Sequence, residues 1–394
     1  MNQLAEEIHR TAKTLLDRIK VYEIEIQAHM AQDKFLKAIQ TGLQVLEFLG
    51  IRFPETPENS DIQTEIETTF ANLGERNPLE LAEIPLMSDR SKLAALRILN
   101  CVCPCAYQAA PQLLPLLVME QVNLSMKYGN SAISPTGYAM WALILCGIVE
   151  DIETGYNFGQ LALSLLERFD SKEIQAGTIF VVNADVRHYR EHIKETLIPL
   201  ESAYSIGLET GDLKFAALAT NIYAYHAYLS GNNLFELRQK IVNYNQVLYK
   251  FKQVNTLNLN QGLQQAIINL LTETEDTCQL IGEAYNRQEM LPQHQQANDA
   301  TANFYVYFNQ MILNYLFENY QQALANAIEA EKYLVGVTAN FVVPVFYFYD
   351  SLVQLAADKK SIDINIPNIL YRVEAYQQKM QKWAYNAPMN FLHK

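Results

Sequence analysis

Residues 319–334 read NYQQALANAIEAEKYL, and this stretch decides the fold class. Ala323, Ala327 and Ala330 recur in it at intervals of three or four residues. That spacing places the three small side chains on one face of an α-helix. Because small side chains let a neighbouring helix approach closely, the stretch predicts one helix of a tightly packed pair.

The same arrangement, a short polar turn followed by a helix, recurs along the chain. Its turns begin at Asp33, Asp151, His192, Gly231, Glu275 and Glu318. From residue 151 onwards they lie about 40 residues apart, a period typical of stacked helix pairs. The sequence lacks the sustained alternation of apolar and polar residues that would indicate strands. We therefore expect an all-α protein, a right-handed α-solenoid of tetratricopeptide-like helix pairs with a period of about 40 residues.

We expect one array over residues 1–394, with a soft division allowed near residues 76–90, because a solenoid gains length without adding independent cores. At its start, apolar residues at helical spacing run from Ile8 to Met30. A second helix is expected from Asp33, acting as N-cap, to Leu49.

The chain is acidic. Its 30 Lys and Arg against 43 Asp and Glu give a formal charge of −13, which opposes binding to phosphate backbones, so no nucleic-acid partner is expected. The N-terminus lacks a basic segment followed by an apolar core, and the five cysteines do not resemble a secreted disulfide framework. These features predict a cytoplasmic location and reduced thiols.

Two apolar stretches, residues 131–149 and 335–357, resemble membrane spans. Pro135 shortens the apolar run of the first to about a dozen residues, and Asp350 interrupts the second, whereas a bilayer requires about 20. We expect both stretches to form buried helices and expect no membrane partner.

Residues 188–192 read HYREH and match the H-x-x-E-H pattern of inverted zinc metallopeptidases. On a helix, His188 and His192 would share a face, and Glu273 or Glu275 could supply a third ligand. The surrounding charged run is instead typical of a solvated helix face, and those peptidases need strands. We therefore expect no metal site and treat the two histidines as weak candidates.

No other catalytic motif is present in the sequence. Cys101, Cys103 and Cys105 lack the spacing of a structural zinc knuckle, and on a helix Cys103 would point away from the other two. The sequence contains no phosphate-binding loop, dinucleotide fingerprint, kinase motif or nucleophile elbow. We expect neither enzymatic activity nor a cofactor.

Aromatic residues are dense in the last third of the chain. They recur at helical spacing, which is typical of a core, but helical-repeat grooves also use such side chains as anchors for a peptide or small effector. The groove candidates are Phe304, Tyr305, Tyr307, Tyr315 and Tyr320.

Several long segments carry a family resemblance. They include DIETGYNFGQLALSLLE from residue 151, RHYREHIKETLIPLESAY from residue 187, LIGEAYNRQEMLP from residue 280 and ANDATANFYVYFNQMILNYLFENYQQALANA from residue 297. They resemble the helical-repeat region of the large cyanobacterial hybrid signalling kinases. In that family a serine/threonine kinase domain and an AAA-type ATPase precede this region, and a GAF sensor and a histidine kinase follow it. The resemblance implies no catalytic residue here.

The resemblance implies a regulatory module that binds a protein partner or small effector and relays to neighbouring kinase and ATPase domains. A stand-alone adaptor for other proteins is the alternative, and a zinc peptidase a remote one. Relatives continue past the position of Lys394, which implies a piece of a longer protein, a split gene product or a truncated copy. The final helix, around Tyr376, Met380 and Trp383, is then expected to leave an apolar surface bare.

Overall fold

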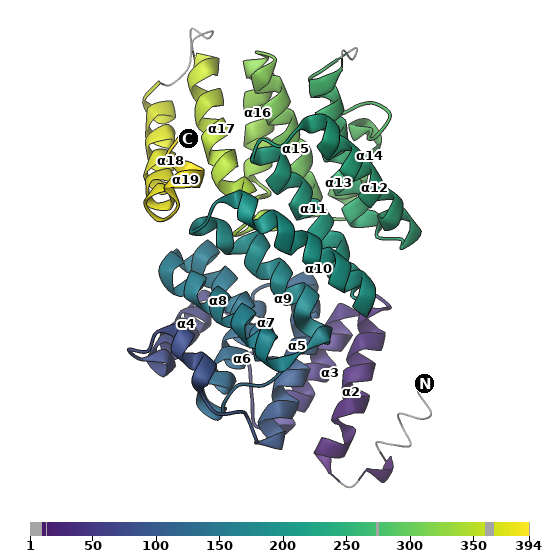
Figure 1. Cartoon of the computed structure of the whole chain (residues 1–394), viewed down its shortest axis with the longest axis vertical. Coiled ribbons are helices and arrows are strands. Elements are labelled where there is room, and N and C mark those ends of the chain that lie inside the picture. The colour runs from purple at the N-terminus through teal and green to yellow at the C-terminus, as the bar shows by residue number, and fades with distance from the viewer. Residues whose placement is uncertain (1–9, 13, 273–275, 359–365, 394) are drawn as a thin grey trace. The chain divides into compact units, whose positions relative to one another are not determined.

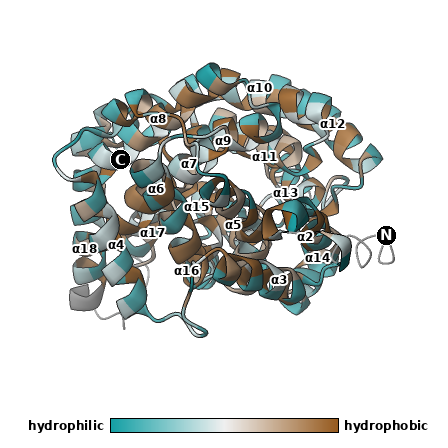
Figure 2. Ribbon diagram, turned by 90° about the horizontal axis from the view of Figure 1, so that it is seen from below, coloured by the Kyte–Doolittle hydropathy of each residue, from teal (hydrophilic) through white to brown (hydrophobic). Residues whose placement is uncertain are grey.

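The computed structural model describes residues 10–12, 14–272, 276–358 and 366–393. The described residues form helices and no strand; they contain only the isolated bridges Leu86–Asn130 and Ile281–Asn286. The all-α prediction is confirmed. In Figure 2 the helices carry bands of both hydrophilic and hydrophobic residues, as amphipathic helices do.

The chain divides into two compact units. The first comprises Met1–Leu145 with Glu153–Ile174, and the second comprises Cys146–Ile152 with Gln175–Lys394. Residues 76–90, where the sequence allowed a soft division, lie inside the first unit.

The first unit is built on pairwise packing of long helices. α3 packs on α2 and α5, and α6 packs on α4, α5 and α7. The helices are α2 (Leu15–Met30), α3 (Phe35–Phe48), α4 (Asn59–Leu73), α5 (Arg90–Ala109), α6 (Leu114–Tyr128), α7 (Ser134–Ile144) and α8 (Ile152–Phe169), with a 3-10 turn η1 (Pro78–Glu83). The π-turn η2 (Leu145–Val149) follows α7 directly, and its residues from Cys146 onwards belong to the second unit.

The second unit pairs α10 with α11, α12 with α13 and α15 with α16, while α11, α13, α15 and α17 adjoin one another in succession. Figure 1 shows α16, α17 and α18 side by side. The elements are α9 (Lys172–Asp185), which begins in the first unit, η3 (Arg187–Tyr189), η4 (Ile193–Thr196), α10 (Leu197–Thr210), α11 (Leu213–Leu229), α12 (Leu234–Lys250), α13 (Val254–Leu271), α14 (Arg287–Gln296), α15 (Ala300–Leu316), α16 (Tyr320–Glu331), η5 (Leu334–Val337), α17 (Val342–Asp358), α18 (Ile366–Asn386) and α19 (Pro388–Phe391).

The predicted polar turns do precede helices. Elements begin directly after Asp151 and His192 and two or three residues after Asp33, Gly231 and Glu318; Glu275 lies outside the described residues. Asp33 was expected to be an N-cap, which is wrong. Its φ of 56° is left-handed, Lys34 takes the cap position, and the residue ends the preceding turn. Ile8 also lies outside the described residues.

Small residues pack where the sequence placed them. Ala323, Ala327 and Ala330 have no exposed surface, and their helix α16 packs closely on α15. Both apolar stretches form buried helices: α7 lies in the first and α17 in the second. Among the described residues, no helix is long and apolar enough to cross a bilayer.

Candidate functional site

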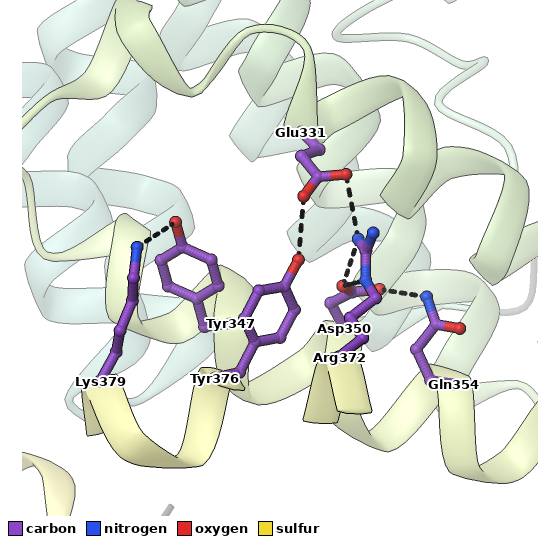
Figure 3. Close-up of polar contacts among 7 residues, drawn as sticks. All are labelled: Glu331, Tyr347, Asp350, Gln354, Arg372, Tyr376 and Lys379. Atoms are coloured by element: carbon purple, nitrogen blue, oxygen red, sulfur yellow. Dashed lines mark hydrogen bonds and ion pairs between the residues drawn. The ribbon is translucent and has the colours of Figure 1, made fainter. Parts of the chain in front are cut away.

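One face of α18 carries a row of large polar and aromatic side chains. Arg372, Tyr376, Lys379 and Trp383 follow at helical spacing, so all four lie on the face that packs against α17. Figure 3 shows the polar part of this cluster, with partners from α16 and α17.

Asp350 of α17 is the buried centre of the cluster. Its side chain has no exposed surface, and its Oδ2 accepts hydrogen bonds from Nε and Nη2 of Arg372 at 3.0 and 2.7 Å. Its Oδ1 accepts a third from Gln354 Nε2 at 3.1 Å. The carboxylate is thus fully paired, as a buried charge must be.

Glu331, at the end of α16, joins the same network. Its Oε2 lies 3.1 Å from Nη2 of Arg372, and its Oε1 accepts a 2.9 Å hydrogen bond from the hydroxyl of Tyr376. Burial and the nearby Asp350 carboxylate raise the pKa of Tyr376 well above its ordinary value. The hydroxyl therefore stays protonated and donates. The network joins α16, α17 and α18.

Aromatic rings continue the row. The Tyr347 ring lies 4.5 Å from that of Tyr376 and 5.9 Å from that of Trp383, centroid to centroid. Lys379 Nζ lies 5.0 Å from the Tyr347 centroid. Because these groups are already paired with one another, the cluster is built to hold helices together.

A hollow of about 500 Å³ opens beside this row. One wall comes from α18, including Gln378, Lys382 and Tyr385, and the other from Val149 and Glu150. Lys382 Nζ and Glu150 Oε2 form an ion pair across it at 2.9 Å. The hollow is thus lined by charged, amide and aromatic side chains.

The structure separates the two motif histidines. α9 ends at Asp185, His188 lies in the short turn η3, and His192 caps η4 through its Nδ1, which accepts the Lys194 amide at 3.1 Å. The prediction of one shared helix face is therefore wrong.

His188 does not lie on a solvated surface. It has no exposed surface, and its ring packs at 4.3 Å from Tyr189 and 5.4 Å from Phe341, centroid to centroid. Among the described residues, no three His, Cys, Asp or Glu side chains converge as metal ligands. Glu273 and Glu275, the third-ligand candidates, lie outside those residues.

Two buried titratable groups lie near this turn and were not singled out from the sequence. Burial lowers the pKa of His226 to about 3 and raises that of Asp185 to about 8. The Thr196 hydroxyl lies 2.7 Å from His226 Nδ1 and already donates its proton to the Ile193 carbonyl. His226 Nδ1 is therefore the donor of this hydrogen bond and carries the proton of the neutral ring. The apolar residues that flank Asp185 and His226 in the sequence are the signal that could have identified both groups as buried.

The groove aromatics fall into two groups. Phe304, Tyr305 and Tyr307 are buried side chains of α15; Tyr305 stacks on Tyr225 of α11 at 4.2 Å. Tyr315 and Tyr320 are partly exposed, with ring centroids 5.9 Å apart. Only this second pair is available at the surface.

The cysteine cluster lies on α5. None of the three forms a disulfide, Cys103 and Cys105 are buried, and the Cys103 sulfur accepts a 3.1 Å hydrogen bond from Gln121. Burial raises the pKa of Cys101 and Cys103 to about 12. Thiols of such high pKa are weak nucleophiles at neutral pH.

Comparison with known proteins gives one partial similarity. The Hybrid signal transduction histidine kinase G of Dictyostelium discoideum is 27% identical over 177 residues, which cover 44% of this chain. The chain covers 5% of the length of that relative. No family model and no solved structure matches. The similarity is to a small part of a long hybrid histidine kinase, and it does not identify the cyanobacterial family.

Proposed function

We propose that this chain is a non-catalytic regulatory helical-repeat module of a multidomain signalling kinase. It binds a protein partner or a small effector in the cytoplasm and relays that binding to kinase and ATPase domains outside these residues. The observation that carries the proposal is the similarity to a hybrid signal transduction histidine kinase.

The helical architecture supports a module of this kind. Helices α11, α13, α15 and α17 contact one another in succession, and each also packs against a second helix, namely α10, α12, α16 and α18 in turn. This arrangement supports a tetratricopeptide-like right-handed α-solenoid with a period of about 40 residues. Such arrays act by presenting extended surfaces to partners. Ligand binding then shifts a two-state equilibrium through its different affinity for the two states.

Capture of partners tests the proposal. The purified chain is used as bait with chemical cross-linking, and partners are identified by mass spectrometry. Proteins that carry histidine kinase or AAA-type ATPase domains are expected. Each captured kinase is then assayed for autophosphorylation with and without the chain, and a change is expected only where binding is coupled to activity.

Two outcomes would contradict the proposal. Partners that share no signalling domain would favour an adaptor for other proteins. Substrate turnover by the chain itself, abolished by a point mutation within it, would make it an enzyme. Incubation with ATP and magnesium is the first such assay, and we expect neither hydrolysis nor labelled protein.

A further inference from the structure

Arg287, the first residue of α14, carries a charge that no ion pair in the described part of the chain balances. Its Nε is buried and forms no hydrogen bond with a described residue. A guanidinium has five N–H donors and no acceptor, and a buried donor without a partner costs free energy. Arg287 is therefore short of an acceptor, which an anionic ligand would supply.

The arginine is held in place by aromatic rings. Its guanidinium carbon lies 5.4 Å from the ring centroid of Tyr307, a buried residue of α15, which is within the range of a cation–π contact. The Tyr307 ring stacks on that of Tyr333 with centroids 6.1 Å apart, and its hydroxyl accepts a 3.3 Å hydrogen bond from Gln295 Nε2. A binding group that is already positioned loses little entropy when a ligand arrives.

A hollow of about 260 Å³ opens beside Arg287. Its lining combines one cation, three amides and two apolar side chains: Arg287, Gln279, Gln288, Gln295, Leu291 and Pro292. All of them except Gln279 belong to α14, and their spacing places them on one face of that helix. Small-molecule pockets usually enclose about 300–1,000 Å³, so this hollow suits a small ligand.

The charge around the hollow favours an anion. It lies at the N-terminal turn of α14, where the helix dipole is positive. The Gln288 amide is already bound by Asn286 Oδ1 at 3.0 Å, so the helix contributes its dipole and not a backbone donor. Nearby carboxylates have other partners: Glu289 Oε1 accepts a 2.7 Å hydrogen bond from Asn286 Nδ2, and Glu283 pairs with Arg238 at 2.8 Å. Neither carboxylate lines the hollow.

Gln279 offers a further donor. Its Oε1 accepts a 2.9 Å hydrogen bond from Gln310 Nε2, which fixes the orientation of the amide. The Nε2 of Gln279 takes no part in that contact and remains a donor for a ligand. The hollow therefore offers N–H groups from two side chains, Arg287 and Gln279.

The lining selects the chemistry of the ligand. One guanidinium balances one negative charge, and its planar fork matches the two oxygens of a carboxylate. A phosphate carries nearly two charges at neutral pH and would lack a second cation in this lining. Leu291 and Pro292 can contact the apolar atoms of a small organic acid.

We propose that this hollow binds a small monocarboxylate, an organic acid with one negative charge and an uncharged remainder, through the guanidinium of Arg287 and the amide of Gln279. The proposal rests on the proposed function, because it gives the chemical class of the small effector that such a module binds.

Ligand-observed NMR on the full chain tests this. The probes are acetate, lactate and benzoate, each paired with its neutral primary amide, which has nearly the same shape without the charge. Saturation-transfer titrations at low salt give the dissociation constants. At least one acid is expected to bind with a dissociation constant of about 10 mM or tighter, and at least tenfold more tightly than its amide.

Variants separate the charge from the hollow. Arg287→Gln removes the guanidinium and should weaken binding of that acid at least tenfold, whereas Arg287→Lys keeps the charge without the fork and should lie between the two. Gln288→Trp keeps the charge but fills the hollow from an exposed position, and it should also weaken binding at least tenfold. Arg52→Gln removes a side chain that is 80% exposed in the first unit and should change binding less than twofold. Circular dichroism confirms that each variant is folded.

The proposal would be overturned by any of three results. They are the absence of saturable binding of every acid to the parent up to about 100 mM, equal binding to the parent and to folded Arg287→Gln, and binding of inorganic phosphate as tight as that of the acids. Should Arg287→Gln fail to fold, Gln288→Trp is judged by the same comparison with the parent.

The two proposals can fail separately. Captured signalling kinases without carboxylate binding would reject this site and leave the proposed function intact. Carboxylate binding that depends on Arg287, without captured signalling proteins, would retain the site and reject the proposed function.

Discussion

The side-chain amide of Asn390 donates a 2.8 Å hydrogen bond to the carbonyl oxygen of His188, about 200 residues earlier in the chain. The same Nδ2 donates to the Glu191 carbonyl at 2.7 Å, and its Oδ1 accepts the Ile193 amide at 3.0 Å. One side chain of α19 thus satisfies three backbone groups between η3 and η4. This contact fixes the turn that interrupts the H-x-x-E-H motif.

Asn390→Ala should therefore destabilise the protein strongly. Asn390 is buried, and its loss removes its hydrogen bonds to two carbonyls and one amide, which should lower the free energy of unfolding by about 2–4 kcal/mol. Urea unfolding followed by circular dichroism measures this. Asn255→Ala, at an exposed helical position, is the control and should stay within about 0.5 kcal/mol. Equal effects of the two substitutions would show that the hydrogen bonds of Asn390 contribute little to stability.

The two motif histidines should respond differently to mutation. His188→Ala removes a fully buried ring from contact with Tyr189 and Phe341 and should cost about 2–4 kcal/mol. His192→Ala removes a cap at the surface of η4 and should cost about 1 kcal/mol. Urea unfolding gives both values. Zinc content, measured by mass spectrometry, should be the same in both variants and the parent. Stoichiometric zinc in the parent that is lost on mutation would support the zinc-peptidase hypothesis instead.

Asp185 should make stability depend on pH. Burial raises its pKa to about 8, against an ordinary value near 4, and no described side chain forms an ion pair with it. Between these two values the folded state binds more protons than the unfolded state, so the carboxyl lowers the free energy of unfolding as pH rises from about 4 to 8. The Asp185 carboxyl interacts electrostatically with Cys146 and Tyr189, but neither side chain carries a positive charge that could neutralise the carboxylate.

Asp185→Asn should remove this slope. The variant should be more stable than the parent at pH 9, by roughly 1–3 kcal/mol, and the difference should shrink below pH 5. Urea unfolding at a series of pH values measures it. Glu209→Gln, at an exposed position of α10, should leave the profile of the parent unchanged. A parent profile that is flat between pH 5 and 9 would contradict the shifted pKa.

The helical fold was predictable because periodicity and turn chemistry are local. Ala323, Ala327 and Ala330 marked their packed face through spacing alone. The H-x-x-E-H motif failed for a physical reason: i and i+4 share a face only on an unbroken helix, and no Pro or Gly marks the break after Asp185. The break depends on Asn390, which is distant in sequence.

The buried amides of α13 and α15 could be suspected only in part; Asn269, Gln310 and Asn314 donate hydrogen bonds to backbone carbonyls between residues 277 and 279. Gln310 and Asn314 stand inside the apolar stretch ATANFYVYFNQMILNYL, where exposed polar residues are not expected. That pattern signals buried amides, but it does not identify their partners. Which segment they hold depends on how the chain returns over α15, and periodicity carries no information about that.

The ion pair at the centre of the α18 cluster should show strong coupling. Arg372→Met leaves the Asp350 carboxylate buried without a cation and should cost about 3–5 kcal/mol. Combining it with Asp350→Asn removes the uncompensated charge and should restore a large part of that loss. Lys382→Met, which removes a lysine 67% exposed, should cost less than about 1 kcal/mol. Additive effects of Arg372 and Asp350 in a double-mutant cycle would contradict a direct pair.

The last helix was expected to leave Tyr376, Met380 and Trp383 bare, and this is wrong. All three are buried, and the Trp383 ring packs between Tyr347 at 5.9 Å and Phe391 of α19 at 6.2 Å. The short helix α19 folds back and covers the apolar face of α18. A charge at Trp383 would therefore disrupt the core of this end of the chain.

Trp383→Ala should lower the free energy of unfolding by about 3–5 kcal/mol, because it removes a large buried side chain from a packed aromatic row. Tyr385, on the same helix, is 88% exposed, so Tyr385→Ala should stay within about 0.5 kcal/mol of the parent. Urea unfolding compares the pair, and light scattering across protein concentration reports self-association. If Trp383 lay on a bare surface instead, its replacement would leave stability unchanged and reduce association, so the two measurements separate a buried residue from an exposed one.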